Sequence, residues 1–300
     1  MRILIVKTTS LGDIIQSLPV ATFFHQKFPE AKIDWVVEKP FEELLEAHPS
    51  ICQVIPVEIR KWKKNFLKHR QALKKTFEAL RKNQYDLLID LQGNIKSGII
   101  TKCAYAKEKI GTTFLSAPEW PNAFFLTHRY SLNKKDPIAL QYLSLVQNHF
   151  SMKPSPVEMN LSFKISSENE AWIAALHREG KKMMVCPGSH WENKKLSLPT
   201  WIELLKKEAA QENPFFYFVW GSEKERQEGA ALHSQFPKSS ILLPKMSLPV
   251  WQRLMSKMDL IYTVDSCALH LAATTKTPTC SFFGPSSAAI YRPPGKSHQS

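Results

Sequence analysis

No stretch of this 300-residue sequence approaches the roughly 18–20 consecutive apolar residues that a helix needs to cross a bilayer. The opening MRILIVK is too short and too strand-like for a secretory signal peptide, and it lacks a small-residue cleavage site. Both absences argue against a membrane-spanning or secreted protein. Because 43% of the residues are hydrophobic, we expect a well-buried globular protein in the cytosol.

Cysteine is scarce and scattered. The chain has five cysteines, with no CxxC pair and no His/Cys cluster at the spacing of zinc ligands. We therefore expect buried free thiols in a reducing compartment and no metal site. The five are Cys52, Cys103, Cys186, Cys267 and Cys280.

Acidic residues are too few to balance the basic ones. There are 27 Asp and Glu against 40 Lys and Arg, which leaves a formal net charge of +13. Such an excess predicts an anionic partner, which the charge alone leaves open as a nucleic acid, a phosphorylated sugar or an anionic membrane surface. From Arg60 to Lys82 the sequence is dominated by Lys and Arg, and Glu78 is its one acid. Interleaved apolar residues predict an amphipathic helix with a basic outer face there.

The first twenty residues form a strand–loop–helix unit. Ile3–Val6 is a short β-branched apolar run typical of a buried strand, and a helical pattern follows from Ile14 to about Phe28. Asp13 lies where the helix begins. One interpretation is a first-turn acid that complements the helix dipole. The other is a general base facing a crevice, which the adjacent Gly12 favours because it allows close approach of a ligand.

Strands and helices then alternate along the whole chain, which predicts an α/β protein with mostly parallel sheets covered on both faces. Gly111–Lys135 is aromatic and proline-bearing, and it predicts an irregular loop with one helical turn. Met152–Leu161 carries two prolines and predicts a linker. We expect two Rossmann-like domains, residues 1–160 and 161–300, with a cleft between them.

Two strand-end loops of the second half carry unusual polar sets. Pro187–Lys195 (PGSHWENKK) offers backbone N–H groups, Ser189 and lysines to phosphate oxygens, although an ordinary polar loop is the plainer interpretation. Asp265 and Ser266 alone would be N-cap residues. His270 follows one turn later, and this clustering favours a ligand site.

The chain resembles the ADP-heptose:lipopolysaccharide heptosyltransferases of glycosyltransferase family 9, and within them most closely the heptosyltransferase I group. The resemblance runs in order over nearly the whole chain. The stretches that carry it are MRILIVKTTSLGDIIQSLP, IDWVVEKPF, VIPVEIRKWKK, YDLLIDLQGNIKS, NKKLSLPTW, FVWGSEKER, LLPKMSL and VDSCALHLAA through FFGP.

The resemblance implies a GT-B fold, in which two Rossmann-like domains face each other across a cleft. The N-terminal domain would bind the acceptor and the C-terminal domain the nucleotide sugar. The family transfers L-glycero-D-manno-heptose from ADP-heptose to Kdo of the lipopolysaccharide inner core, with inversion and without an obligatory metal or other cofactor. By the same resemblance we expect a monomer that is peripheral on the cytoplasmic face of the inner membrane, with ADP-heptose and Kdo-lipid A as partners and no nucleic acid.

The resemblance also implies residue roles. Asp13 takes the position of the catalytic base, and Lys194 that of the lysine on the donor diphosphate. The implied donor-binding residues are Ser189, Lys194, Glu225 on the ribose, Met246 by the adenine, Asp265, Ser266 and His270. The implied acceptor-binding residues are Thr9, Ser10, Gly12, Arg60, Lys61 and Lys64. The chemistry agrees with these roles, because the departing diphosphate gains negative charge that a lysine and helix N-termini stabilise.

The sequence departs from the family pattern at three places. Asp265-Ser266-Cys267 stands where the family commonly has Asp-Thr-Gly, so the expectation is a crowded donor site or altered backbone geometry. Pro118 and Leu140 stand near places where arginines are expected, which suggests a different acceptor contact. The chain ends at Ser300, where family members usually continue with a helix, which implies a less tied domain pair or a shortened chain.

Three alternatives stay open at this stage. One is a related GT-B transferase with another nucleotide-sugar donor or a later core acceptor, of the heptosyltransferase II or III kind. Another is a basic nucleic-acid-binding protein, which fits the charge but has no recognised nucleic-acid motif. The last is a binding protein that has lost catalysis, suggested by Cys267 and the short C-terminus.

Overall fold

A computed structural model describes residues 1–64, 69–153, 159–295 and 297–300, and leaves the side chains of Arg60, Lys63 and Lys64 outside the description. The chain divides into two compact units, an N-terminal unit of Met1–Glu158 and a C-terminal unit of Met159–Ser300. The division falls within Met152–Leu161, the segment predicted as a linker.

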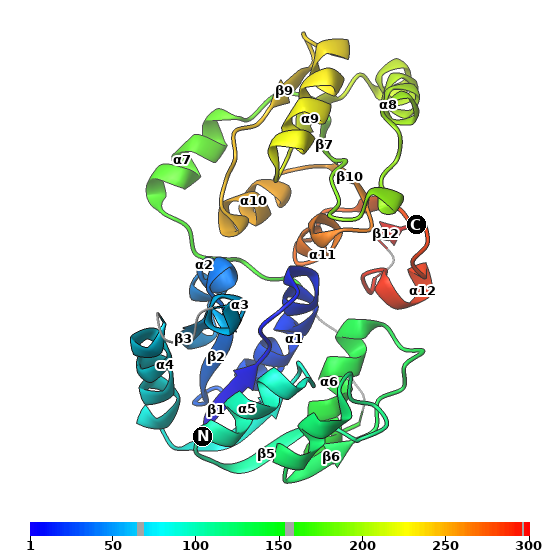
Figure 1. Ribbon diagram of the computed structural model, residues 1–300. Helices are drawn as coiled ribbons and strands as arrows, with labels where there is room; N and C mark the ends of the chain where they lie inside the picture. The colour runs from blue at the N-terminus through cyan, green and yellow to red at the C-terminus, as the bar shows by residue number, and fades with distance from the viewer. Residues whose placement is uncertain (65–68, 154–158, 296) are drawn as a thin grey trace. The chain divides into compact units, whose positions relative to one another are not determined.

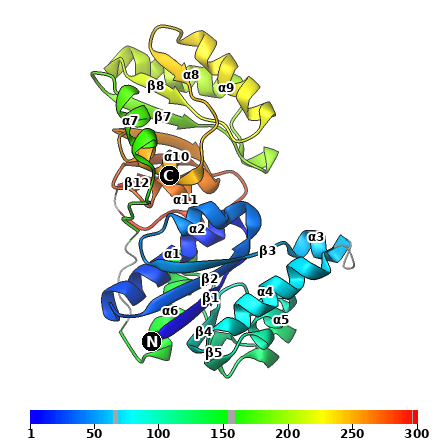
Figure 2. The same ribbon diagram turned by 90° about the vertical axis from the view of Figure 1, so that its left-hand side faces the viewer.

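Each unit is built on a six-stranded parallel sheet with helices on both faces (Figure 1, Figure 2). The strand order is β3-β2-β1-β4-β5-β6 in the N-terminal unit and β12-β11-β10-β7-β8-β9 in the C-terminal unit. Counted from the first strand of each unit, both sheets have the doubly wound order 3-2-1-4-5-6. The predicted α/β class with two parallel-sheet domains is therefore confirmed.

The elements of the N-terminal unit alternate as the sequence predicts. Its strands are β1 (Arg2–Val6), β2 (Lys32–Glu38), β3 (Ile51–Val57), β4 (Tyr85–Asp90), β5 (Ala106–Thr112) and β6 (His128–Tyr130). Its helices are α1 (Leu11–Lys27), η1 (Lys39–Phe41), α2 (Glu42–Glu46), α3 (Ile59–Lys64), α4 (Arg70–Lys82), α5 (Ile95–Cys103), η2 (Trp120–Phe125) and α6 (Ile138–His149).

The C-terminal unit repeats the arrangement. Its strands are β7 (Lys182–Cys186), β8 (Phe215–Phe218), β9 (Ser240–Leu242), β10 (Leu260–Val264), β11 (Thr279–Phe282) and β12 (His298–Gln299). Its helices are α7 (Ser167–Ala175), η3 (Glu192–Lys194), α8 (Leu198–Glu212), α9 (Glu223–Gln235), α10 (Leu248–Met255), α11 (Cys267–Ala272) and α12 (Ala288–Tyr291).

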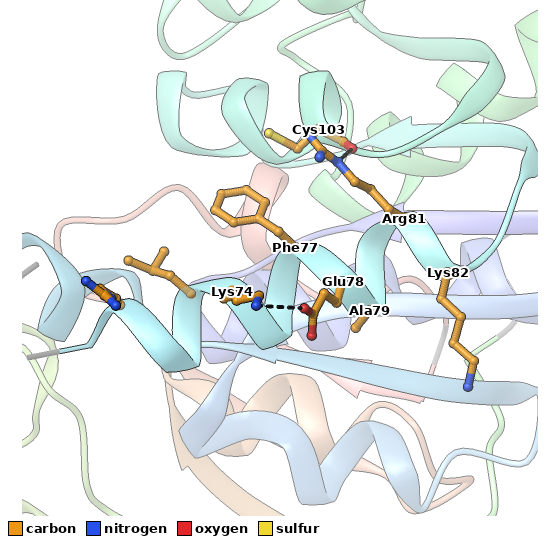
Figure 3. Close-up of a pocket in the computed structure, with 9 residues that line it drawn as sticks. Lys74, Phe77, Glu78, Ala79, Arg81, Lys82 and Cys103 are labelled. Carbon is orange, nitrogen blue, oxygen red and sulfur yellow. Dashed lines mark hydrogen bonds and ion pairs between the residues drawn. The ribbon is translucent and has the colours of Figure 1, made fainter. Parts of the chain in front are cut away.

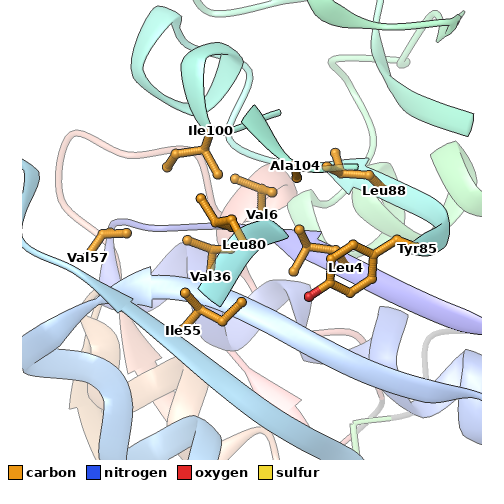
Figure 4. Close-up of a cluster of buried hydrophobic side chains, with 10 residues drawn as sticks. All are labelled: Leu4, Val6, Val36, Ile55, Val57, Leu80, Tyr85, Leu88, Ile100 and Ala104. Atoms are coloured by element: carbon orange, nitrogen blue, oxygen red, sulfur yellow. The ribbon is translucent and has the colours of Figure 1, made fainter. Parts of the chain in front are cut away.

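Successive residues of β1 point to opposite faces of its sheet, and both faces are buried. On one face, Leu4 and Val6 pack with Leu80 of α4 and Ile100 of α5 (Figure 4). The helices α1 and α6 pack together on the other face (Figure 2). Burial of each such leucine or isoleucine contributes about 1.5–3 kcal/mol relative to leaving it exposed. Packing on both faces fixes the position of the strand, so residues at its carboxyl end can be held in defined positions.

The prediction for Gly111–Lys135 is partly wrong. Gly111 and Thr112 end the strand β5, and His128–Tyr130 form the edge strand β6. The predicted helical turn corresponds to η2. The strands escaped detection because β5 is only half-buried at its charged start, Lys107–Lys109, and β6 is three residues long.

The single helix predicted for Arg60–Lys82 is also wrong in part. The structure has two helices there, α3 and α4, because His69 before α4 is not helical; residues 65–68 lie outside the described part of the chain. The amphipathic pattern itself is correct for α4, since Leu80 is buried in the core while Lys74, Lys75 and Arg81 face solvent.

Candidate functional site

In the N-terminal unit, polar loops gather where the strand order reverses. The chain runs from β1 outward to β2 and β3, and then returns to place β4 on the other side of β1. The loops that follow β1 and β4 therefore lie at the reversal point, beyond the carboxyl ends of the strands, where ligands of such sheets bind. Gln92 joins the two loops, because its Oε1 accepts hydrogen bonds from the N–H groups of Thr8 and Thr9, both at 3.0 Å.

Asp13 lies in the first turn of α1 and is half-buried. Its Oδ2 accepts hydrogen bonds from Ser10 N–H at 3.3 Å and from Ser10 Oγ at 2.9 Å. The helix-capping interpretation of this residue is therefore realised in the structure. Among the described residues no donor contacts the other carboxylate oxygen, Oδ1, so that oxygen can accept a proton from a ligand. Of the predicted acceptor-binding residues, Thr9, Ser10 and Gly12 lie in the same loop and turn.

Two buried ionisable groups behind Asp13 were missed by the sequence reasoning. Lys7 follows β1 directly and is 3% exposed, with its Nζ 5.0 Å from the ring centre of Tyr142. Burial lowers the pKa of Lys7, and the carboxylates of Asp13 and Asp90 oppose that change. A lysine at the end of an otherwise apolar strand was the signal that could have revealed it.

Asp90 ends β4 and organises the second loop. It accepts hydrogen bonds from Gln92 N–H and Gly93 N–H, both at 2.9 Å, and from Asn122 Nδ2 at 2.7 Å. Burial raises the pKa of the Asp90 carboxyl, and these hydrogen bonds oppose the rise. Gly93 has φ +68°, and a Cβ there would lie 2.7 Å from Cδ of Pro118. Pro118, noted as a departure, thus packs against this turn.

The predicted basic acceptor segment is only partly visible. The side chains of Arg60 and Lys64 lie outside the description, so their roles stay predictions. Lys61 is exposed, and its Nζ lies 2.5 Å from Glu58 Oε1. The pKa of Glu58 is lowered mainly by that hydrogen bond.

In the C-terminal unit the strand order reverses between β7 and β10. The loop after β7 carries Lys194, and the residue that follows β10 is Asp265. Lys194 Nζ donates to Asp265 Oδ2 at 2.6 Å, and Ser286 Oγ donates to the same oxygen. Asp265 is 3% exposed whereas the Lys194 side chain is 23% exposed. The carboxylate therefore holds the ammonium group in place, while the lysine side chain stays partly exposed.

Close backbone approach supports this arrangement. A Cβ at Gly284 would lie 2.8 Å from the carbonyl oxygen of Asn193, so only glycine lets the loop after β11 pass beside the Lys194 loop. The neighbouring Lys195 has a different environment, because its Nζ lies 3.2 Å from Glu192 and 3.6 Å from Glu228. The Lys195 side chain is 9% exposed and that of Lys194 is 23% exposed, so Lys194 is the more exposed of the two lysines.

Glu225 and the Ser189 loop also meet. Glu225 Oε2 accepts hydrogen bonds from Gly221 N–H at 2.8 Å and Ser222 N–H at 3.0 Å, which makes it part of the capping box of α9. A Cβ at Gly188 would lie 2.5 Å from the Glu225 carboxyl carbon. Ser189 is buried beside this contact, and its Oγ accepts from Trp191 N–H at 3.4 Å.

The remaining predicted donor-binding residues are Ser266, His270 and Met246. Ser266 caps α11, accepting from Ala268 N–H at 3.3 Å, and His270 is buried in the same helix. Met246 is half-buried in the segment before α10. No hydrogen bond or ring contact within the described part of the chain joins Met246 to Lys194 or Glu225.

The structure answers one concern about Cys267. Ser151 and Asn213 are the non-glycine residues with positive φ in the described chain, so Cys267 has an ordinary backbone conformation. Cys267 therefore needs none of the conformational freedom of glycine, and the expectation of a crowded donor site or of backbone geometry altered from the family pattern stays a prediction.

The thiol of Cys267 should be unreactive. Burial raises its pKa to about 11, and the Glu225 carboxylate adds to the rise. Because the thiolate is the nucleophile, we expect iodoacetamide at neutral pH to label Cys267 far more slowly than the exposed Cys52. Peptide mass spectrometry over a labelling time course measures both rates, and equal rates would contradict the raised pKa of this thiol.

Among the described residues, no group of three or more His, Cys, Asp or Glu is arranged to hold a metal ion. No described helix is both long and apolar enough to span a membrane.

Comparisons with known proteins agree on one family. A family model described as glycosyltransferase family 9 (heptosyltransferase) matches residues 73–300. The chain is 28% identical to lipopolysaccharide heptosyltransferase 1 of Escherichia coli K12 over 305 aligned residues, which cover 99% of this chain and 92% of that relative.

Solved structures give the same result. The fold is similar to that of E. coli heptosyltransferase WaaC with ADP, with a TM-score of 0.87 at 27% identity. It is also similar to WaaC with ADP-2-deoxy-2-fluoro heptose, with a TM-score of 0.85 at 27% identity. Each match covers 100% of this chain and 92% of the other. The likeness therefore extends over both units, as the predicted GT-B architecture requires.

Proposed function

The chain belongs to glycosyltransferase family 9, and from this premise we propose that it transfers a heptosyl group from ADP-heptose to Kdo of the lipopolysaccharide inner core. The predicted resemblance and the glycosyltransferase activity class are confirmed by the family match and by the relatives named heptosyltransferase. The observation that carries the proposed donor is the Lys194–Asp265 pair at the reversal point of the C-terminal sheet.

The donor diphosphate would bind at Lys194. Its ammonium group is held by a buried carboxylate, and its side chain is partly exposed. We expect it to contact phosphate oxygens with little further loss of conformational entropy. As the glycosidic bond breaks, negative charge grows on the departing ADP, and a fixed cation stabilises that charge. Glu225 and Met246 are assigned to the nucleoside, and Ser189, Ser266 and His270 to the remaining donor contacts.

The acceptor hydroxyl would lose its proton to Asp13. Ser10 donates two hydrogen bonds to Oδ2 of this carboxylate and so fixes its orientation. The other oxygen, Oδ1, is left for the incoming hydroxyl. A positioned carboxylate of this kind suits an inverting transfer, in which one base acts on the attacking hydroxyl. Thr9, Ser10 and Gly12 shape the surroundings, and Arg60, Lys61 and Lys64 are assigned to the anionic groups of the acceptor.

The proposed reaction also has consequences for the need for a metal and for the place of the enzyme in the cell. Because Lys194 supplies positive charge to the leaving group, no metal or other cofactor is assigned to the reaction. An acceptor carried by a lipid places the enzyme peripherally at the cytoplasmic face of the inner membrane, and we take it to act as a monomer.

The test is a transfer assay with the purified full chain, ADP-heptose and Kdo-lipid A. We expect stoichiometric release of ADP, a product heavier by one heptosyl unit, and unchanged rates in EDTA. Acceptors that already carry one or two heptoses distinguish the alternative of a later core transferase, and other nucleotide sugars distinguish another donor. Absence of transfer to every acceptor, with ADP still bound, would instead support a binding protein that has lost catalysis.

A further inference from the structure

Six large apolar side chains are exposed on neighbouring segments of the N-terminal unit. They come from α5, from the loop after β5 and from η2. Leu115 is 92% exposed, Phe124 64% and Trp120 58%. We call them the apolar patch: Ile95, Ile99, Phe114, Leu115, Trp120 and Phe124. Leaving so much apolar surface in water is unfavourable, and clustered exposure of this kind marks an interaction site.

Ring contacts within the apolar patch and hydrogen bonds beneath it hold its side chains in a defined arrangement. Phe124 makes edge-on contacts with Phe114 at 5.2 Å and with Trp120 at 5.8 Å between ring centres. Beneath it, the fully buried Asn122 donates to Asp90 Oδ2 at 2.7 Å and to the carbonyl of Asn94 at 3.0 Å. Because these bonds anchor η2, the aromatic rings are held outward at little further entropic cost.

Helix α5 is shaped to receive η2. A Cβ at Gly98 would lie 2.6 Å from Cδ2 of Phe125, so glycine is needed for η2 to pack this closely. Phe125 therefore faces α5 while its neighbour Phe124 remains exposed. Ile95 and Ile99, one turn apart on α5, extend the patch along the helix.

Cations lie beside the patch, together with one exposed acid, Glu119, which accepts the N–H of Ile95 at 2.9 Å. Lys96 and Lys102 are exposed on α5, and the Arg129 guanidinium lies 5.2 Å from the ring centre of Phe114. Helix α4 covers the same face of the sheet as α5 and carries a basic outer surface. Between α4 and the end of α5 lies an open cavity of about 970 Å³. Figure 3 shows Arg81 reaching the carbonyl oxygen of Cys103 and Lys74 paired with Glu78, while Lys82 points away from them.

We propose that this face binds an anionic phospholipid bilayer, with the apolar patch inserted at the level of the headgroups and the cations of α4 and α5 on lipid phosphates. Trp and Phe rings favour the membrane interface, and basic residues beside them add attraction to anionic lipids. The inference rests on the proposed function for the lipid-borne acceptor, but its residues are separate from those assigned to donor and acceptor.

Charge favours a bilayer over other occupants. In a symmetric dimer each patch would meet its own copy, and the cations of α4 and α5 would face like charges. A nucleic acid would engage the cations but has no counterpart for the aliphatic side chains of Leu115, Ile95 and Ile99. An anionic bilayer offers both a negative surface and an apolar layer beneath it.

The test uses the full-length protein and vesicles of phosphatidylcholine with or without phosphatidylglycerol, free of any sugar acceptor. The triple variant L115S/W120S/F124S changes only exposed side chains, and its thermal unfolding should match that of the wild type. We expect wild type to co-sediment with the anionic vesicles and the triple variant to partition at least about tenfold less. The matched control W191S removes a tryptophan of similar exposure, 62%, from the C-terminal unit and should bind vesicles like wild type.

Two readouts identify the occupant. Brominated lipids should quench tryptophan fluorescence in wild type, and W120F should lose that quenching while keeping vesicle binding. The triple variant should transfer heptose to a deacylated, water-soluble acceptor at the wild-type rate. Vesicle binding unchanged by the triple variant would overturn the proposal, as would a wild-type dimer that the variant converts to monomer, or RNA binding that it abolishes. Failure of the proposed function would appear differently, as wild-type binding to vesicles without transfer to either acceptor.

Discussion

Replacing Asp13 by asparagine is expected to lower kcat by about 100- to 10,000-fold, because loss of a general base removes that much of the rate in other enzymes. The substitution separates the two roles of this side chain. An asparagine oxygen can still accept the hydrogen bonds that Ser10 N–H and Ser10 Oγ donate to Asp13 Oδ2. It cannot take up the proton of an attacking hydroxyl. Steady-state kinetics with ADP-heptose and Kdo-lipid A, together with thermal unfolding, measure both effects.

Ser10→Ala is the matched control. It removes one of the donors to Asp13 and leaves the carboxylate in place, so it should cost about 0.5–2 kcal/mol of stability as other cap losses do. Its kcat should stay within about tenfold of wild type, since the base is still present. If Asp13→Asn is stable and fully active, Asp13 is a helix-capping residue and the base lies elsewhere.

The sheets were predictable from the sequence because parallel strands are buried on both faces. Such strands contain short apolar runs, as in Ile3–Val6, Leu87–Ile89 and Leu260–Val264, and all three lie in strands of the structure. Strands at and next to the edge of the N-terminal sheet can lack this signal, as do the edge strand β6 and its neighbour β5. In β5 the start is charged and half-exposed, and β6 is too short for any alternation to show.

The candidate site was predictable as positions but not as contacts. Asp13 comes after a strand of the N-terminal sheet, and Asp265 comes after a strand of the C-terminal sheet. Ligands of parallel sheets bind beyond the carboxyl ends of the strands, so the place of each residue within its own unit follows from the pattern. That Lys194 pairs with Asp265 depends on β7 and β10 being neighbours, and the two residues are 71 positions apart. The contact between Glu225 and Gly188 likewise depends on how two loops meet.

Asp90 shows a further reason why part of the site could not be predicted from the sequence. In the sequence it is the last residue of an apolar run, with nothing to distinguish it from a solvent-exposed loop acid. The structure buries it and surrounds it with donors from its own loop and from Asn122, which is 32 residues away. Its partner, η2, lies in the segment that the sequence left irregular, so the network could not be inferred before that segment was placed.

Replacing Lys194 by methionine is expected to lower kcat by about 100- to 1,000-fold and to weaken ADP binding, because the charge that stabilises the departing diphosphate is gone. The same change removes the cation beside Asp265, a 3% exposed carboxylate whose other hydrogen bond comes from Ser286. A buried charge that loses its partner costs up to about 3–5 kcal/mol, so the variant should also unfold more easily. Kinetics, calorimetric titration with ADP and urea unfolding measure the three effects.

A double-mutant cycle with Asp265→Asn separates catalysis from stability. The double variant has neither charge, so it should recover part of the stability lost in Lys194→Met. Its activity should stay as low as that of Lys194→Met, because the cation is still missing. Asp265→Asn alone keeps the lysine but no longer pairs it with a carboxylate 2.6 Å away, so the main change should be a higher KM for ADP-heptose. If the double variant regains activity along with stability, the role of Lys194 is to neutralise Asp265, and the diphosphate is stabilised by other groups.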